Sequence, residues 1–386
     1  MVSRSLVSVL ATVGTAASFF VAVDATHAQA PAASRPAQTA KQAKPPKPWP
    51  PDADALKQRR LEAEALPLFA SVEPVDVTIT ADFKAVQRDR DADSKKTYPG
   101  TIAVVTGGVA GPAIPIQLRT RGHSRRNVRT CNFAPLRLEF AKDQVRETLF
   151  ERQGAVKLGT HCQDAGVFRQ YTLKEHLASR ILNVLTPRSL RSRLAHVTYV
   201  DSASGQKPFT QLGIFFEDKD DMAKRVEARE EPREGLLFGH LDQPTLIQMS
   251  LFEYMIGNTD YSIAALHNVV IVVDSKGVLY PVPYDFDYSG LVDAHYAVPT
   301  KFLGLVSVRD RMYRGPCKTE ALLEPVLEQF RAKKDEILAL PAAMPGLDEG
   351  HRKNVEKYLN QFFDLISRPD KVKRTFLTEC KFMAGM

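Results

Sequence analysis

Two short apolar runs near the middle of the chain constrain its fold more than any other feature. The first, Val269–Val273, is separated from the second, which ends at Pro283, by the turn sequence Asp274–Gly277. Closely spaced runs of this kind predict a hairpin of two strands. An apolar, helix-like segment, Leu246–Ile256, leads into it through the polar break Gly257–Asp260. A hairpin here would bring the polar groups at its outer ends close together in space.

Those polar groups suit phosphoryl transfer. Asp260 is the candidate carboxylate that orients the attacking hydroxyl or accepts its proton. Asp285 and Asn268 are candidate oxygen ligands of Mg²⁺ or Mn²⁺, and Asp287 is a third candidate that would share the metal or hold a loop. His267 is interpreted as a structural hydrogen-bonding residue. The alternative is that these aspartates only cap turns.

The motifs themselves resemble those of a known family. GNTD, HN and PYDFD follow one another between Gly257 and Asp287, and RGHS occupies residues 121–124. Together with the segment LGIFFEDKDD that begins at Leu212, they resemble the catalytic and metal-binding segments of the CotH-like (spore-coat) secreted atypical protein-kinase-like family. The resemblance covers about Val75 to Pro299.

The resemblance implies an α+β, two-lobed protein-kinase-like fold. Its N-terminal lobe, about 70–216, would be an antiparallel sheet with one main helix. Its C-terminal lobe, about 236–386, would be mostly helical and carry the catalytic hairpin, and the whole kinase-like domain would span 55–386. The implied activity is transfer of the γ-phosphate of ATP, with Mg²⁺ or Mn²⁺, to a hydroxyl of an exported protein or glycan.

The resemblance also suggests where the nucleotide binds. Gly122 and Ser124 could let a backbone turn approach the phosphates. Many relatives carry a lysine where this chain has Thr130-Cys131-Asn132. Lys157 could supply the missing cation, with Glu175 on the following helix to position it. The departure leaves open a non-catalytic, pseudokinase-like binding module of the cell envelope or matrix.

The N-terminal residues predict export. Arg4 precedes an apolar run, Leu6–Val23, and the sequence Ala-Gln-Ala at 28–30, or Thr-His-Ala at 26–28, offers a cleavage site. Residues 1–30 are therefore interpreted as a signal peptide. An uncleaved anchor is the alternative, and no later segment is apolar enough to span a membrane. Residues 31–54, rich in Pro, Ala and Lys, predict a disordered tether. The expected location is secreted or periplasmic, in a bacterium.

Four cysteines fit an oxidising compartment. Residues 135–140 and 155–160 read as short strands joined near residues 146–147, which would place Cys131 opposite Cys162. Cys317 and Cys380 would then form the second disulfide. Four reduced, buried thiols are the alternative.

The remaining pattern gives an expected element order. The formal charge of +7 includes five arginines between 119 and 129, which we interpret as phosphate-binding because they surround Gly122; nucleic acid is not an expected partner of an exported chain. Apolar periodicity predicts strands at 75–81, 101–105, 114–119, 135–140, 155–160, 196–200 and 212–216, and helices at 173–185, 246–256, 320–340 and 351–367. Strands first and helices later is an α+β order.

Overall fold

The computed structural model describes residues 49–299 and 301–380. The predicted signal peptide and most of the predicted tether lie outside these residues. The end of the tether is ordered: Trp49 Nε1 donates to the carbonyl oxygen of Asp274 at 3.3 Å. Helix α1 (Ala53–Glu64) begins directly afterwards, capped by the Asp52 carboxylate, which accepts from the amide of Ala55 at 2.7 Å.

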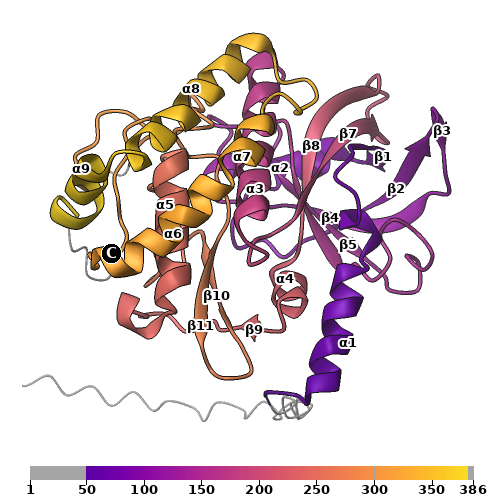
Figure 1. The fold of residues 1–386 in the computed structure, drawn as a ribbon. Helices are drawn as coiled ribbons and strands as arrows, with labels where there is room; N and C mark the ends of the chain where they lie inside the picture. The colour runs from indigo at the N-terminus through magenta and orange to yellow at the C-terminus, as the bar shows by residue number, and fades with distance from the viewer. Residues whose placement is uncertain (1–48, 300, 381–386) are drawn as a thin grey trace, which may run out of the picture. The chain divides into compact units, whose positions relative to one another are not determined.

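Seven strands form a closed, mixed barrel (Figure 1). Strand β1 closes it because β1 pairs in antiparallel with β2 on one edge and in parallel with β7 on the other. The short strand β3 (Val109–Ala110) extends β2 outside the ring. In spatial order the strands of the ring are β1 (Val75–Ala81), β7 (Ser192–Asp201), β8 (Phe209–Phe216), β6 (Ala155–Gly159), β5 (Leu136–Phe140), β4 (Ile114–Thr120) and β2 (Tyr98–Thr106).

This barrel corrects the expected fold. The two-lobed protein-kinase-like fold, with an open antiparallel N-terminal sheet and a helical C-terminal lobe, is wrong. Strand β1 alternates between buried side chains and side chains that are half-buried or exposed, as the sequence predicts. That alternation marks the buried face but does not say which strands lie on either edge, and the parallel partner β7 lies far along the chain.

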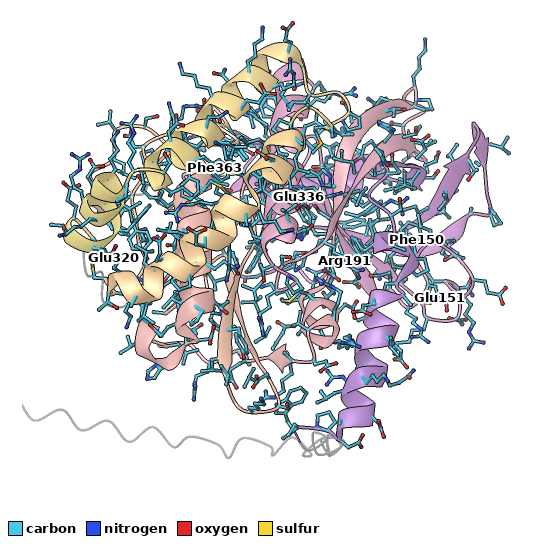
Figure 2. The ribbon with its side chains drawn as sticks, viewed as in Figure 1. Phe150, Glu151, Arg191, Glu320, Glu336 and Phe363 are labelled. Atoms are coloured by element: carbon cyan, nitrogen blue, oxygen red, sulfur yellow. A yellow bond between two sulfur atoms is a disulfide. The ribbon has the colours of Figure 1, made fainter. Side chains whose placement is uncertain are left out.

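Side chains fill the barrel. Tyr199, Phe150 and Phe215 are fully buried in one cluster with the apolar residues of the surrounding strands. Phe150, labelled in Figure 2, comes from the connection between β5 and β6 and stacks on Phe140 at 5.0 Å. The interior is therefore a packed core, and any ligand site must lie at an end of the barrel or beside it.

A second core forms where helices gather beside the barrel (Figure 1). Helix α3 (Gly166–Leu185) packs against β7 and β8 on one side and α7 on the other. The remaining helices are α2 (Phe83–Arg88), α4 (Lys219–Arg225), α5 (Gln243–Ile256), α6 (Glu320–Ala332), α7 (Lys334–Ala339), α8 (Glu349–Ile366) and α9 (Pro369–Val372). Short single-turn helices lie at Pro67–Phe69, Ser124–Arg126, Phe238–His240, Lys301–Leu303 and Lys373–Thr378.

The predicted hairpin is confirmed. Strands β10 (Val269–Val273) and β11 (Leu279–Pro283) pair in antiparallel, with Val269 opposite Pro283 at the open end. The two-residue strand β9 (Arg229–Glu230) pairs with β10 at its turn end, opposite Val272 and Val273.

Both predicted disulfides are confirmed. They are Cys131–Cys162 and Cys317–Cys380, so none of the four cysteines is free. Among the described residues, none of the helices combines the length and the apolar character that a membrane span requires.

Candidate functional site

Helix α5 delivers the chain to the candidate site through a glycine. Gly257 ends the helix in the left-handed conformation, with φ of +67°, and a Cβ there would lie 2.0 Å from the hydroxyl of Tyr358. Only glycine meets both demands without strain. The next residue, Asn258, is buried and accepts from the amide of Asp260 at 3.0 Å. The position of Asp260 is therefore fixed by the end of a buried helix.

Two side chains hold the Asp260 carboxylate. His267 Nε2 lies 3.1 Å from one oxygen, and Asn268 Nδ2 donates to the other at 3.1 Å. The same Asn268 amide donates to the Asp260 carbonyl at 2.7 Å. The hydrogen bond to Asp260 raises the pKa of His267. The prediction that His267 forms a structural hydrogen bond is confirmed, and its partner is the candidate base.

The open end of the hairpin carries two strained residues. Asn268 and Asp285 have φ of 53° and 68°, a conformation that residues other than glycine rarely adopt. The carbonyl of Asn268 accepts from the amide of Tyr284 at 3.0 Å, which extends the hairpin pairing to this point. Strain of this kind is concentrated at functional sites, where the surrounding fold maintains it.

Arg125 lies at the centre of an acidic cluster. Its guanidinium is 3.3 Å from Glu175 of α3, 3.4 Å from Asp287 and 3.9 Å from Asp285. Glu175 therefore pairs with Arg125, and the expectation that it positions Lys157 is wrong: no ion pair joins those two within the part of the chain that the structure describes. Arg125 faces all three carboxylates, and the charges of Arg121 and Lys157 also act on Asp285.

The three carboxylates differ in their exposure to solvent. The side chains of Glu175 and Asp287 are 4% and 8% exposed, whereas that of Asp285 is 34% exposed. Burial raises the pKa of Glu175 and raises that of Asp287 well above its ordinary range, against the opposing effect of Arg125. Burial also acts on Asp285, but Arg125 and Arg121 outweigh it and lower the pKa of that carboxyl. Asp285 is thus the ionised, accessible member of the cluster.

A cavity of 230 Å³ brings most of the predicted site residues together. Asp260, Asn268, Asp285 and Asp287 line it together with the 121–125 loop. Within that loop Gly122 has φ of +92°, so the expected backbone turn is present. The predicted residues on the wall of this cavity are Gly122, Ser124, Asp260, Asn268, Asp285 and Asp287.

Lys157 lies at an adjoining recess rather than in the main cavity. This recess has a volume of 30 Å³, room for about one water molecule, and it shares Arg121, Arg125 and Asp285 with the main cavity. Burial, and then the charges of Arg121 and Lys219, lower the pKa of Lys157 to about 8. The other walls of the recess are mostly apolar and include Leu182, Leu190, Phe216, Pro283 and Phe286.

The residues present fit a hard divalent cation only in part. Among the described residues, no three His, Cys, Asp or Glu side chains are grouped as a metal site. Asp285 supplies one accessible carboxylate, and Asn268 uses its amide nitrogen on Asp260, so its Oδ1 is left for another partner. Mg²⁺ is often held by one or two carboxylates, with waters and substrate phosphates completing its shell. Asp287, fixed by Arg125 and by the Tyr296 hydroxyl at 3.2 Å, is less accessible to a metal.

Comparison of the chain with protein-family models and with curated proteins finds no match. The site therefore rests on its own geometry.

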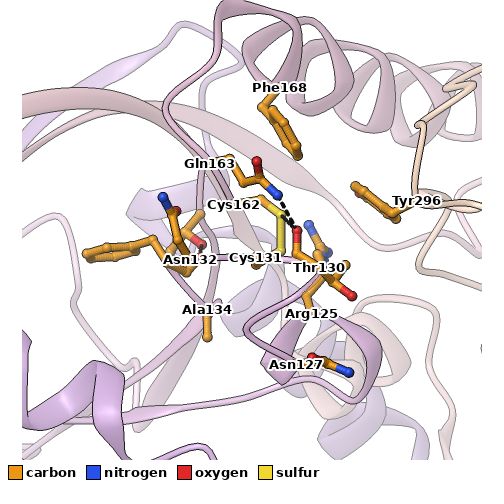
Figure 3. The surroundings of a disulfide bond; sticks show 12 residues. Arg125, Asn127, Thr130, Cys131, Asn132, Ala134, Cys162, Gln163, Phe168 and Tyr296 are labelled. Atoms are coloured by element: carbon orange, nitrogen blue, oxygen red, sulfur yellow. Dashed lines mark hydrogen bonds between the residues drawn. A yellow bond between two sulfur atoms is a disulfide. The ribbon is translucent and has the colours of Figure 1, made fainter.

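Sequence reasoning overlooked Arg125 and Tyr296 as individual members of the site. Arg125 directly follows the RGHS motif, but its neighbours in sequence are also basic, and nothing distinguished it from them. Tyr296 packs at 6.5 Å from Phe168, beside the Cys131–Cys162 disulfide (Figure 3). Its bond to Asp287 has no signal in the sequence.

Proposed function

We propose that the chain is an exported phosphotransferase that uses a nucleotide and a divalent cation. One observation carries this proposal: the accessible, ionised Asp285 and the oriented Asp260 line one cavity together with a basic, glycine-containing loop. Phosphoryl transfer requires these elements, namely a carboxylate for the metal, a carboxylate for the attacking hydroxyl and cations for the phosphates. The motifs that resemble those of the CotH-like kinases support the same activity, although the fold differs from the expected one.

Export belongs to the proposal. The apolar run at Leu6–Val23 and the two disulfides both favour an oxidising compartment outside the cytoplasm.

In the proposed reaction, the acceptor hydroxyl attacks from the side of Asp260. Its oxygen forms a bond to the γ-phosphorus, and the bond between that phosphorus and the bridging oxygen breaks. ADP leaves with the bonding electron pair, and the hydroxyl proton passes to the Asp260 carboxylate. His267 and Asn268 keep that carboxylate in place, so its orientation does not have to be established at each turnover. A divalent cation on Asp285 and Asn268 would offset the phosphate charge.

The nucleotide base would enter the recess beside Lys157. Its apolar walls suit a planar ring. Arg121 lines both the recess and the main cavity, and Lys157 lines the recess, so both cations are available to the polyphosphate. The recess must widen to admit a base because its volume is only 30 Å³.

A non-catalytic nucleotide-binding module is the second candidate. The observation that favours it is the pairing of Asp287 with Arg125, which leaves a single accessible carboxylate for a metal. Such a module would bind nucleotide and fail to transfer phosphate to an envelope or matrix partner.

The test separates binding from transfer. Titration calorimetry with ATP and Mn²⁺, and mass spectrometry of autophosphorylation, would be applied to the mature protein and to Asp285→Asn and Asp260→Asn. Asp285→Asn is expected to weaken nucleotide and metal binding together by about tenfold or more, because an amide is a poor ligand for a hard cation. Asp260→Asn is expected to retain binding and lose transfer, because Asp260 acts only as the hydroxyl attacks.

Asp274→Asn is the matched control. It is the same substitution at the opposite end of the same hairpin, where Asp274 accepts from the amides of Lys276 and Val278. It should lower stability without changing affinity. Unchanged nucleotide affinity in Asp285→Asn would refute the proposed site, and transfer that is absent in the wild type while binding persists would establish the second candidate.

A further inference from the structure

A larger cavity, separate from the acidic site, opens at the end of the barrel that α2 covers. Its volume is 730 Å³, and it shares no lining residue with the two recesses around Asp285. Strands β1 and β7 end here, and β8 begins here with Phe209 opposite Tyr199. A volume of this size falls within the range of about 300–1,000 Å³ that is typical of small-molecule sites.

Aromatic rings form one wall of this cavity. Phe133 and Phe209 are half-buried and lie 6.1 Å apart in an edge-to-face arrangement, and Phe83 lies 5.7 Å from Phe133. Below them Tyr199 stacks on Phe209 at 5.1 Å and is fully buried. The rings rest on the barrel core, and part of their apolar surface faces the cavity, where it would gain from contact with an apolar face of a ligand.

A buried histidine joins the aromatic wall. His161 is 2% exposed and lies 4.9 Å from the ring of Phe133. Its Nδ1 has no hydrogen-bond partner among the described residues, and its Nε2 is 3.5 Å from Asp164. Burial lowers the pKa of His161 to about 4, so at neutral pH the ring offers one N–H and one lone pair. A buried polar atom without a partner is uncommon and marks a place that a ligand or a bound water can satisfy.

The remaining wall is polar and close to neutral. Asn132, Gln206 and Gln211 carry amides that both donate and accept. Lys84 and Lys207 are balanced in number by Asp164 and Asp201. The cavity therefore favours neither an anionic nor a cationic ligand, unlike the basic 121–125 loop.

The Cys131–Cys162 disulfide fixes the walls of the cavity. It joins the loop that carries Asn132 and Phe133 to the loop that carries His161. The amide of Phe133 donates to the carbonyl of Cys162 at 3.0 Å, which reinforces the link. In Figure 3, Asn132 lies on one side of the disulfide and Tyr296 on the other. A cavity with walls held in this way loses little conformational entropy when it binds a ligand.

We propose that this cavity binds a short neutral oligosaccharide. A pyranose ring presents a C–H face that packs on an aromatic ring, and its hydroxyls both donate and accept, as do the amides and the neutral imidazole around the cavity. Because the charges on the wall balance, the cavity has no excess of cations that would favour a sulfated or phosphorylated sugar over a neutral one. The site is independent of the proposed phosphotransferase activity.

The experiment uses the mature protein and four neutral probes: chitotriose, maltotriose, cellotriose and xylotriose. Saturation-transfer NMR identifies which of them bind, and calorimetry measures the affinity. At least one is expected to bind, and Phe209→Ala and Asn132→Ala should each weaken it about tenfold, the loss expected for one stacking ring or one bidentate amide. Asp260→Asn should leave the affinity unchanged.

Phe302→Ala is the matched control, because Phe302 is 71% exposed and lies outside this cavity. Circular dichroism of each variant would verify folding. The proposal is overturned if none of the four probes binds, or if binding is the same in Phe209→Ala and Asn132→Ala as in the wild type.

Discussion

Glu253 provides the sharpest test of the electrostatics behind Asp260. It lies on α5, is 1% exposed, and is one turn from the helix end that delivers Asp260. Burial raises its pKa to about 8, against the smaller opposing effects of Asn258 and Arg314, while Asp260 adds to the rise. A carboxyl that is neutral at pH 7 and close to the candidate base is unusual, and its substitution has a calculable consequence.

The direction in which stability changes with pH follows from how many protons the folded and unfolded states bind. The ordinary pKa is 4.5, so between pH 4.5 and pH 8 the folded protein keeps a proton that the unfolded chain releases. The free energy of unfolding therefore falls as pH rises through this interval, by about 1.4 kcal/mol per pH unit and by about 5 kcal/mol in total. Below pH 4.5 the contribution to stability is fully present, and above pH 8 it is fully lost. Relaxation around the charge makes about 5 kcal/mol an upper value.

Glu253→Gln removes the titration and keeps the shape. Urea unfolding of both proteins from pH 5 to pH 9 gives the difference in unfolding free energy, in which other titrating groups such as His161 and His176 cancel. The unfolding free energy of the variant, relative to that of the wild type, is expected to increase steadily up to pH 8 and to stay constant above it. Glu349→Gln, on the exposed first turn of α8, is the control and should give a flat difference. A flat difference for Glu253→Gln would refute the account of Glu253 as a buried, neutral carboxyl.

Two further predictions concern Gly257, which ends α5 before Asp260, and Lys157, which lines the adjoining recess. Gly257→Ala should lower the unfolding free energy by about 2 kcal/mol or more in urea denaturation, because φ is +67° and Tyr358 occupies the space of a Cβ. Gly239→Ala, where nothing lies within 4 Å, is its control and should change little. Nucleotide affinity should fall as pH rises above 8, the pKa that burial, Arg121 and Lys219 give to Lys157, because polyphosphate binds the protonated form. Lys157→Arg should remove that dependence in calorimetry, and an unchanged pH profile would show that Lys157 does not meet the phosphates.

Local structure was predictable because it depends on neighbours in sequence. Strand β1 has the predicted bounds, and the hairpin of β10 and β11 is where its turn sequence placed it. The same locality made the site visible, because Asn268 and Asp285 directly flank that one hairpin and Asp260 precedes it by nine residues. The Cys131–Cys162 disulfide followed from the pairing of β5 with β6.

Long-range pairing was not predictable in the same way. His196 on β7 lies beside Asp76 on β1 across 120 residues, and that parallel register is what closes the barrel. Arg125 and Glu175 meet across 50 residues, and so the pairing expected between Glu175 and Lys157 was wrong. In both cases a residue has other possible partners closer in the sequence, and the tertiary packing of the whole domain determines which pair forms.

The structure also separates aspartates that hold turns from those that do not. Asp274, in the hairpin turn, accepts two backbone amides, and Asp242 caps α5 by accepting from the amide of Thr245. Within residues 49–299 and 301–380, the carboxylate oxygens of Asp260 and Asp285 accept no backbone amide. Asp260 binds side chains, and Asp285 faces Arg125 and the cavity. Turn capping therefore does not account for these two residues. The strained backbone that places Asp285 in the cavity is better explained by a functional role of its carboxylate.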